Sequence, residues 1–179
     1  MRIQNQFDVP VALSDAWAFL MNIPAAVPCF PGAELVEQVD DNNYKGRITV
    51  KLGPLAMIFN GKLRLENADA AAHAGTVNAT WTEAKGRGNA TTVTRFTMHE
   101  HEGGTRVALD TDVQLAGQVA QYGRGAGMIA DISSQLISKF ADNLRARLNE
   151  TAMEHGEISG LSLASRALLN RFKRSADSK

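Results

Sequence analysis

MIADISSQLISKFADNLRARL, residues 128–148, is the stretch that decides the fold. Its large apolar side chains recur about every four residues, which is the spacing of one face of an α-helix: Met128, Ile132, Leu136, Phe140, Leu144 and Leu148. Polar side chains such as Gln135, Lys139 and Asp142 occupy other faces. A helix of about 25 residues spans roughly 40 Å at about 1.5 Å per residue. The stretch therefore predicts a helix long enough to lie across a whole sheet.

Most of the chain before this helix alternates polar and apolar residues, which is typical of β-strands. A first strand is expected from Ile3 to Val9, and six more at 34–39, 43–52, 55–66, 75–84, 88–100 and 104–115. Short turns such as DDNN at 40–43 and KGRGN at 85–89 join them. Consecutive strands must then run antiparallel, because a parallel crossover needs about a dozen residues or more.

Two short helices are expected after the first strand. Ser14 is the predicted N-cap of one helix, and Pro24 is predicted to end it. Residues 23–32, IPAAVPCFPG, are predicted to form a short helical or turned piece, because prolines interrupt them. The order of elements predicts an α+β fold in which a curved antiparallel sheet of about seven strands wraps around a long C-terminal helix.

The composition excludes several classes of protein. The chain has 19 basic and 19 acidic side chains, so its formal net charge is zero and no overall field gathers nucleic acid. Cys29 is the only cysteine, which excludes an internal disulfide and is typical of a reducing compartment. The N-terminus lacks the apolar core of a signal peptide, and no stretch reaches the about 20 apolar residues of a spanning helix. We expect a cytoplasmic protein that uses no metal or cofactor.

Three stretches carry a resemblance to a known family: PCFPGAELVE at 28–37, VKLGPLAMIFNGKLRL at 50–65 and LAGQVAQYGRGAGMI at 115–129. They are similar to the CoxG family of carbon monoxide dehydrogenase subunits, and the similarity covers about residues 1–150. The resemblance implies the helix-grip fold of the START and Bet v 1 superfamily, with a deep apolar cavity between sheet and long helix. It also implies an accessory protein of a molybdenum-containing dehydrogenase that associates with the membrane and binds a quinone or similar lipid.

Large apolar residues of the sheet and helix have two interpretations. They either fill the core or line a cavity, because a helix laid into a strongly curved sheet leaves space that side chains do not always fill. Flexible methionines suit such a pocket. The residues predicted to contact the ligand are Phe30, Phe59, Trp81, Phe96, Tyr122, Met128, Ile132 and Leu136.

The segment GQVAQYGRGAGM, residues 117–128, is rich in glycine and precedes the long helix. It matches a dinucleotide-binding fingerprint only in part, since Met128 takes the place of the third glycine and the strands are antiparallel. Its glycines either turn the chain from strand to helix or keep a gate beside the cavity open. The predicted gate glycines are Gly117, Gly123, Gly125 and Gly127.

A few polar residues are candidates for chemistry. His99 and His101 lie two apart on a strand and could share a metal, although a solvated strand end is the favoured interpretation. Cys29 is expected to be a buried small apolar residue and not a nucleophile. Asp110 and Asp112 could supply acid or base chemistry in a cyclase-like relative of this fold, although a position facing solvent is the favoured interpretation. Glu83 shares a face with Trp81, and if it points inward, burial is expected to raise its pKa and make it the best catalytic candidate.

Residues 151–179 differ in character from the domain at 1–150. The segment EHGEISG at 154–160 is typical of a linker, and the rest predicts a basic amphipathic helix that either binds a membrane surface or a partner, or folds back on the domain. The residues predicted to make that contact are Leu161, Arg166, Leu168, Arg171, Phe172, Lys173 and Arg174.

Two functions are consistent with these features. The favoured one is a non-enzymatic carrier that holds a quinone- or lipid-like molecule and serves a carbon monoxide dehydrogenase at the inner face of the membrane. The alternative is a cyclase, dehydratase or hydrolase that acts on a polyketide- or steroid-like substrate in the same cavity. Fold alone does not separate the two.

Overall fold

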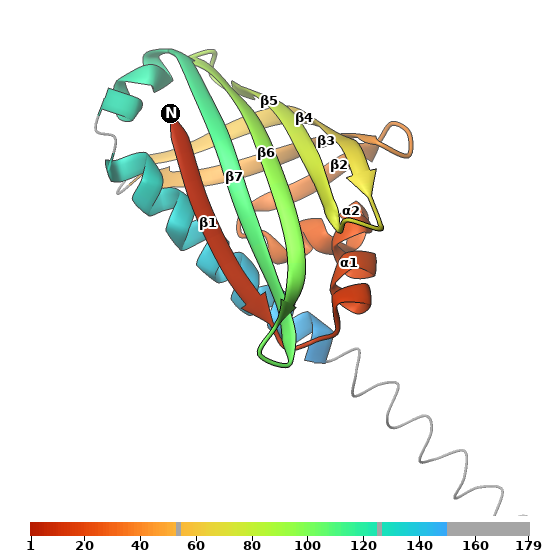
Figure 1. Ribbon diagram of the computed structural model, residues 1–179. Helices are drawn as coiled ribbons and strands as arrows, with labels where there is room; N and C mark the ends of the chain where they lie inside the picture. The colour runs from red at the N-terminus through yellow and green to blue at the C-terminus, as the bar shows by residue number, and fades with distance from the viewer. Residues whose placement is uncertain (53–54, 125–126, 150–179) are drawn as a thin grey trace, which may run out of the picture. The chain divides into compact units, whose positions relative to one another are not determined.

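The computed structural model describes residues 1–52, 55–124 and 127–149, and its strands form one antiparallel sheet (Figure 1). The strand order is β1-β7-β6-β5-β4-β3-β2, so the strands from β2 to β7 pair in sequence order and β1 pairs with β7. The strands are β1 (Arg2–Val9), β2 (Ala33–Gln38), β3 (Asn43–Leu52), β4 (Leu55–Asp69), β5 (Ala74–Glu83), β6 (Gly88–His101) and β7 (Gly104–Gly117). The predicted α+β architecture is confirmed.

Two strands run further than the alternation predicts, and one is irregular. β4 continues to Asp69, past Asn67, whose φ is 51°, and its register against β5 shifts between Glu66 and Asp69. β7 continues to Gly117, which pairs with Gly88 of β6. β2 lies at an edge of the sheet and carries a bulge between Leu35 and Glu37. Bulges and long strands of this kind bend a sheet.

The short helices after β1 are present, but their ends differ from the prediction. α1 (Leu13–Met21) begins before Ser14, and its N-cap residue is Ala12, which makes no side-chain capping bond. Pro24 does not end α1; it lies in the first turn of α2 (Ile23–Ala26), where a missing N–H leaves no bond unmade. The Asn22 side chain caps α2 by accepting from the N–H of Ala25 at 3.3 Å. A 3₁₀ turn, η1 (Val27–Cys29), follows.

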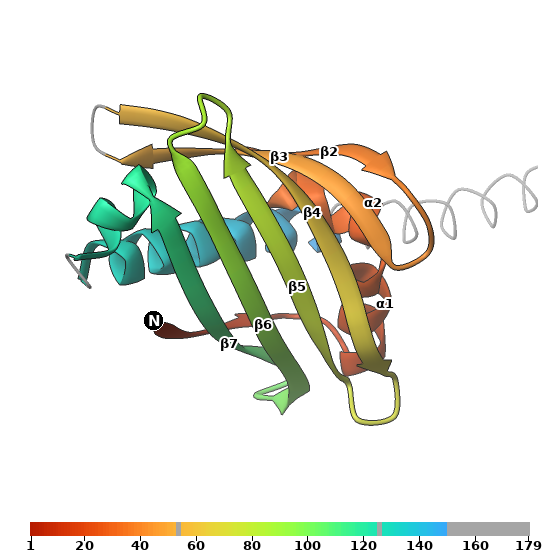
Figure 2. The ribbon, with the colours of Figure 1, turned by 90° about the horizontal axis from the view of Figure 1, so that it is seen from above.

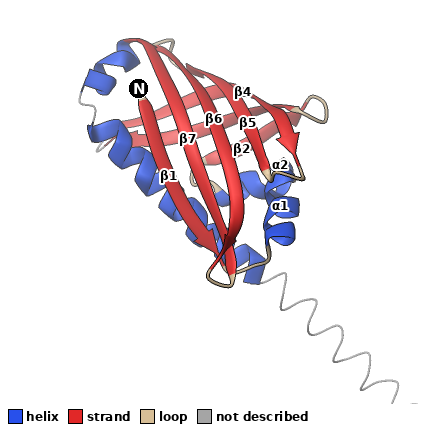
Figure 3. Cartoon of the chain, viewed as in Figure 1, coloured by secondary structure: helices blue, strands red, loops and turns tan. Residues whose placement is uncertain are grey.

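The long helix, residues 127–149, follows a second 3₁₀ segment, η2 (Gln118–Arg124). Phe7 of β1 and Phe30 each contact Phe140 of this helix with ring centroids 5.6 Å apart. The amide of Asn143 donates to the carbonyl of Cys29 at 2.9 Å. Figures 2 and 3 show α1, α2 and the long helix on the same side of the sheet. We call the side of the sheet that carries Phe7 the inner face.

By its internal contacts the chain divides into two units, Met1–Leu144 and Arg145–Lys179. Of the second unit the structure describes only residues 145–149, so the predicted contacts from Leu161 to Arg174 lie outside the described residues. Within the described ranges, no helix is both long and apolar enough to cross a membrane.

Candidate ligand-binding face

The inner face of the sheet is tightly packed at one end. Phe7, Val9, Phe96, Met98 and Val107 are only 2% to 7% exposed. Register pairs Phe7 with Val107 and Val107 with Met98, so these side chains form one continuous patch. We call these five residues the packed end. Its rings and branched side chains fill the space between the sheet, the short helices and the part of the long helix around Phe140.

Further along the same strands the inner face is covered unevenly, since Tyr44, Met57 and Ala79 are 1% to 5% exposed while their neighbours are half-buried. Six half-buried residues there are apolar and lie on the inner face: Ile48, Phe59, Leu63, Trp81, Val113 and Leu115. On the helix, Ile132 and Leu136 are likewise half-buried. We call these eight residues the open end. Apolar side chains that stay in reach of solvent on an inner face are typical of a ligand site and not of a closed core.

Small residues in one row of the sheet account for the difference. Gly46 pairs with Gly61, Gly61 with Trp81, and Trp81 with Ala90. The Trp81 ring lies against Gly61 so closely that a Cβ at that position would overlap it. Three of these four inner-face positions therefore have little or no side chain, and the indole of Trp81 occupies the space above Gly61. The sequence shows these glycines, but not that they share a row.

The predicted ligand-contacting residues fall into separate groups. Phe59, Trp81, Ile132 and Leu136 belong to the open end. Phe96 belongs to the packed end, where its ring centroid lies 6.1 Å from that of Trp17 in α1. Phe30 packs on Phe140. The remaining two lie apart from these: Met128 is 45% exposed at the start of the long helix, and the side chain of Tyr122 is outside the described part of the chain. Ligand contact by these residues stays a prediction.

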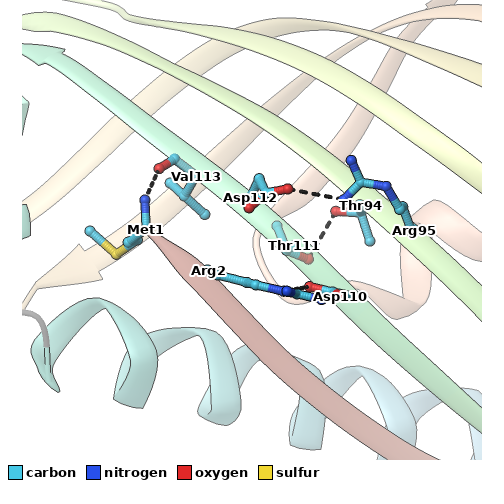
Figure 4. Close-up of polar contacts among 8 residues, drawn as sticks. All are labelled: Met1, Arg2, Thr94, Arg95, Asp110, Thr111, Asp112 and Val113. Atoms are coloured by element: carbon cyan, nitrogen blue, oxygen red, sulfur yellow. Dashed lines mark hydrogen bonds and ion pairs between the residues drawn. The ribbon is translucent and has the colours of Figure 1, made fainter.

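Hydroxyl and amide groups lie beside the open end, and sequence reasoning missed them. Thr94 of β6 and Thr111 of β7 pair across the strands, with their hydroxyl oxygens 3.0 Å apart (Figure 4). Asn5 of β1 donates from Nδ2 to the hydroxyl of Ser133 on the long helix at 2.9 Å. We call these four residues the polar wall. The sequence pattern that could have predicted them is the alternation in β6. Ala90, Thr92 and Thr94 share the inner face of that strand, so two hydroxyl groups lie there.

Glu83 lies on the inner face at the end of β5 and is 2% exposed. The expectation of a raised pKa is wrong, because hydrogen bonds to the carboxylate outweigh the effect of burial. Its Oε1 accepts from Nη2 of Arg87 at 2.7 Å, and its Oε2 accepts from the backbone N–H groups of Lys85 and Arg87 at 2.9 and 3.2 Å. These bonds, the Arg87 side chain first, lower the pKa of Glu83 to about 2. Glu83 is therefore an ionised anchor of the β5–β6 turn and a poor proton donor.

The glycine-rich segment turns a corner at its start. Gly117 ends β7 with a φ of 71°, a conformation that favours glycine. Within η2, Val119 is 3% exposed, and its N–H donates to the carbonyl of Arg87 at 3.2 Å. Gly123 lies in η2, Gly127 at the start of the long helix, and Gly125 outside the described residues. β7, which precedes the segment, pairs antiparallel with both of its neighbours, and this does not fit a dinucleotide-binding unit. A gating role stays a prediction.

The other polar candidates lie on the face turned away from the long helix. Asp110 accepts from Arg2, with 2.7 Å to Nε, and Asp112 accepts from Nη1 of Arg95 at 2.9 Å (Figure 4). His101 lies 3.8 Å from the carboxylate of Glu102. In the parts of the chain that are described, His, Cys, Asp and Glu side chains form no group of three that could hold a metal ion. Cys29 is buried, as expected.

Comparison with known proteins agrees with this geometry. The family model that describes CoxG, a subunit of carbon monoxide dehydrogenase, matches residues 6–149. The chain therefore belongs to that family, and the resemblance is confirmed. A search of curated proteins finds no match.

Several solved structures share the fold. A conserved protein from Geobacillus kaustophilus is 14% identical with a TM-score of 0.74, over 84% of this chain and 97% of that chain. A protein from Mycobacterium smegmatis is 16% identical with a TM-score of 0.59, over 84% and 92%. The Zhui aromatase/cyclase from Streptomyces sp. R1128 is 12% identical with a TM-score of 0.59, over 85% and 95%. At such low identity the likeness shows the fold alone.

Proposed function

We propose that this member of the CoxG family is a non-enzymatic accessory protein that holds a quinone- or lipid-like molecule at the open end and delivers it to a carbon monoxide dehydrogenase. Membership of the family supports the accessory role. The observation that supports binding of an apolar ligand is the half-buried apolar surface of Phe59, Trp81, Ile132 and Leu136. A flat apolar molecule would cover it and gain the free energy of removing that surface from water.

The polar wall supports a ligand with a polar head. Two threonine hydroxyls that bond each other use one of their two protons, so one proton is left to donate. That donor suits a carbonyl oxygen, whereas a plain hydrocarbon would leave it without an acceptor. A molecule with an apolar body and a carbonyl head therefore matches both parts of the face.

The alternative of a cyclase or hydrolase has less support. Among the described residues, Glu83 is the best catalytic candidate that the sequence predicts. Its carboxylate is bonded to the side chain of Arg87 and to two backbone N–H groups. An acid whose pKa is about 2 is a weak general base and does not donate a proton near neutral pH.

Binding of menadione by the full chain, measured by titration calorimetry, tests the proposal. Leu136→Trp fills the open end and should weaken binding at least about tenfold, since it takes the space of the ligand. The matched control is Ile58→Trp, which adds an indole to an exposed position of β4 outside the inner face. Equal binding by the two variants, or no binding by the unaltered chain at the solubility limit of menadione, would contradict the proposal.

The basic segment from Leu161 to Arg174 is proposed to bring the protein to an anionic membrane. Four basic side chains and no acid lie in this segment, and residues 175–179 add Asp177 and Lys179, which favours attraction to anionic lipid that salt weakens. The full chain should float with vesicles of phosphatidylglycerol and phosphatidylcholine at low salt and lose that binding in high salt. A chain that ends at residue 155 should stay in the unbound fraction at both salt concentrations. If the shortened chain floats as well as the full chain, this part of the proposal is wrong.

A further inference from the structure

A hollow lies on the side of the sheet opposite the open end. Its volume is about 460 Å³, and it crosses strands β3 to β6. It is lined by Val39, Asp40, Asn43, Tyr44, Lys45, Lys62, Leu63, Arg64, Asn78, Ala79, Thr80, Thr91, Thr92 and Val93. None of these residues is on the long helix or belongs to the packed end, and the open end contributes only Leu63.

Strand register places this hollow on the outer face. Tyr44, Leu63, Ala79 and Thr92 form one inward-facing row across the four strands. The other strand residues of the lining come from the two rows on either side, whose side chains point outward. A hollow walled by both outer rows and floored by the backbone of the inner row between them is a trough on the outer face. Figure 2 looks onto this side of the sheet.

The charges at one end of the trough are unbalanced. Lys45 of β3 lies directly opposite Lys62 of β4, and like charges in that position destabilise a sheet. Nζ of Lys45 reaches Glu37 at 2.7 Å. Lys62 has no ion-pair partner in the part of the chain that the structure describes. An anion between the two ammonium groups would relieve their repulsion.

The carboxylates beside the trough are already engaged and leave Lys62 uncompensated. Glu66 forms an ion pair with Nε of Arg64 at 3.3 Å and accepts a hydrogen bond from Nδ2 of Asn78 at 2.7 Å. Asp40 accepts from the N–H of Asn42 and from the side chain and backbone of Asn43, and these bonds lower its pKa. The far end of the trough offers the neutral hydroxyls of Thr80 and Thr91.

We propose that this trough is a second binding site, separate from the open end, for a small organic anion with a carboxylate or phosphate group. The ammonium groups of Lys62 and Lys45 hold the charged group, and the body of the molecule lies over the trough floor toward Thr80 and Thr91. The volume is within the range of small-molecule sites, about 300–1,000 Å³. The site is solvent-facing, so its binding weakens as ionic strength rises.

The experiment is an amide ¹H–¹⁵N titration of the full chain with phenyl phosphate, benzoate and neutral benzamide at fixed ionic strength. Phenyl phosphate should shift the amide signals of Lys62, Thr80 and Thr91, and benzoate should shift the same set more weakly. Benzamide should leave them in place. The comparison of phosphate with carboxylate tells which charged group the site prefers, and shifts confined to the inner face would overturn the proposal.

Two lysine variants separate this site from general attraction to a basic surface. Lys62→Gln should weaken phenyl phosphate binding at least about fivefold, because it removes the uncompensated ammonium group. Lys51→Gln alters an exposed lysine of the same strand pair outside the trough and should leave binding unchanged. Equal losses in both variants would overturn the site. Tighter binding of a hexaglutamate peptide than of phenyl phosphate would overturn the small-molecule assignment in favour of an acidic partner segment.

Discussion

The packed end and the open end are built from the same strands and the same helix, yet only one of them is a closed core. At the packed end, Phe7 and Phe96 meet rings from the helices and leave at most 7% of each residue exposed. At the open end, Gly46, Gly61 and Ala90 contribute almost no volume to their row. The difference teaches that side-chain size along one row, and not a change of backbone architecture, decides how closely the inner face is packed.

The largest expected effect breaks the comparison directly. Phe7→Ala should lower the free energy of unfolding by about 3–5 kcal/mol, because it leaves a cavity in a closed core. Phe59→Ala, in the open end, should lower it by only about 1–2 kcal/mol, because the side chain is already partly in water. Urea unfolding followed by circular dichroism measures both. Equal losses would mean that the open end is packed as tightly as the rest.

Glu83 lies on the same face, opposite Phe59 at the end of β5. Replacing it should have an intermediate effect on the stability of the fold. Glu83→Gln should lower the Tm at pH 7 by roughly 8 °C, because it breaks a buried ion pair. The folded pKa of Glu83, about 2, lies below its ordinary value of 4.5. Its contribution is therefore complete above about pH 4.5 and is lost as the pH falls toward 2.

Thermal unfolding between pH 2 and 7 gives the measurement for Glu83. The stability of the Gln variant should fall less steeply between pH 4.5 and 2 than that of the unaltered chain. Glu66→Gln is a suitable control, because Glu66 is a partly exposed acid on the other face. If the stability of the Glu83 variant and that of the unaltered chain fall equally steeply between pH 4.5 and 2, the ion pair contributes nothing to folding.

The smallest expected effect sharpens the chemistry of the open end. Thr94→Val should change the free energy of unfolding by less than about 1 kcal/mol, since it removes one hydroxyl-to-hydroxyl bond. It should nevertheless reduce the preference for menadione over 2-methylnaphthalene about fivefold, the equivalent of one hydrogen bond. Thr97→Val, on the outer face of the same strand, is the control. An unchanged preference would remove the polar wall from the site while leaving apolar binding intact.

The sequence predicts the architecture well because the fold depends on period and spacing. Alternation and short turns fix six antiparallel strands, and the apolar stripe from Met128 to Leu148 fixes the helix. The start of α1 differs from the prediction because Ser14 resembles an N-cap. The helix in fact begins at Leu13, and its N-cap residue, Ala12, makes no side-chain capping bond. Local signals give such boundaries poorly when tertiary packing holds the helix.

The site is less predictable because it depends on register. The four inner-face positions in the row from Gly46 to Ala90 are far apart in sequence and meet only through the pairing of β3 to β6. The pKa of Glu83 depends on Arg87, four residues later across a turn, whose guanidinium outweighs burial. The sequence shows the residues of both features. It does not show that the small residues share a row of the sheet, or that Arg87 reaches the carboxylate of Glu83.

The bulge in β2 bears on how the protein avoids self-association. β2 ends one side of the sheet, so its outward N–H and C=O groups could template another chain and start fibril growth. The shift between Leu35 and Glu37 interrupts that ladder, and the Glu37–Lys45 pair adds charge beside it. A strand from a second molecule could match the hydrogen-bonding pattern of β2 only up to this shift. The bulge therefore disfavours amyloid-like stacking at this edge of the sheet.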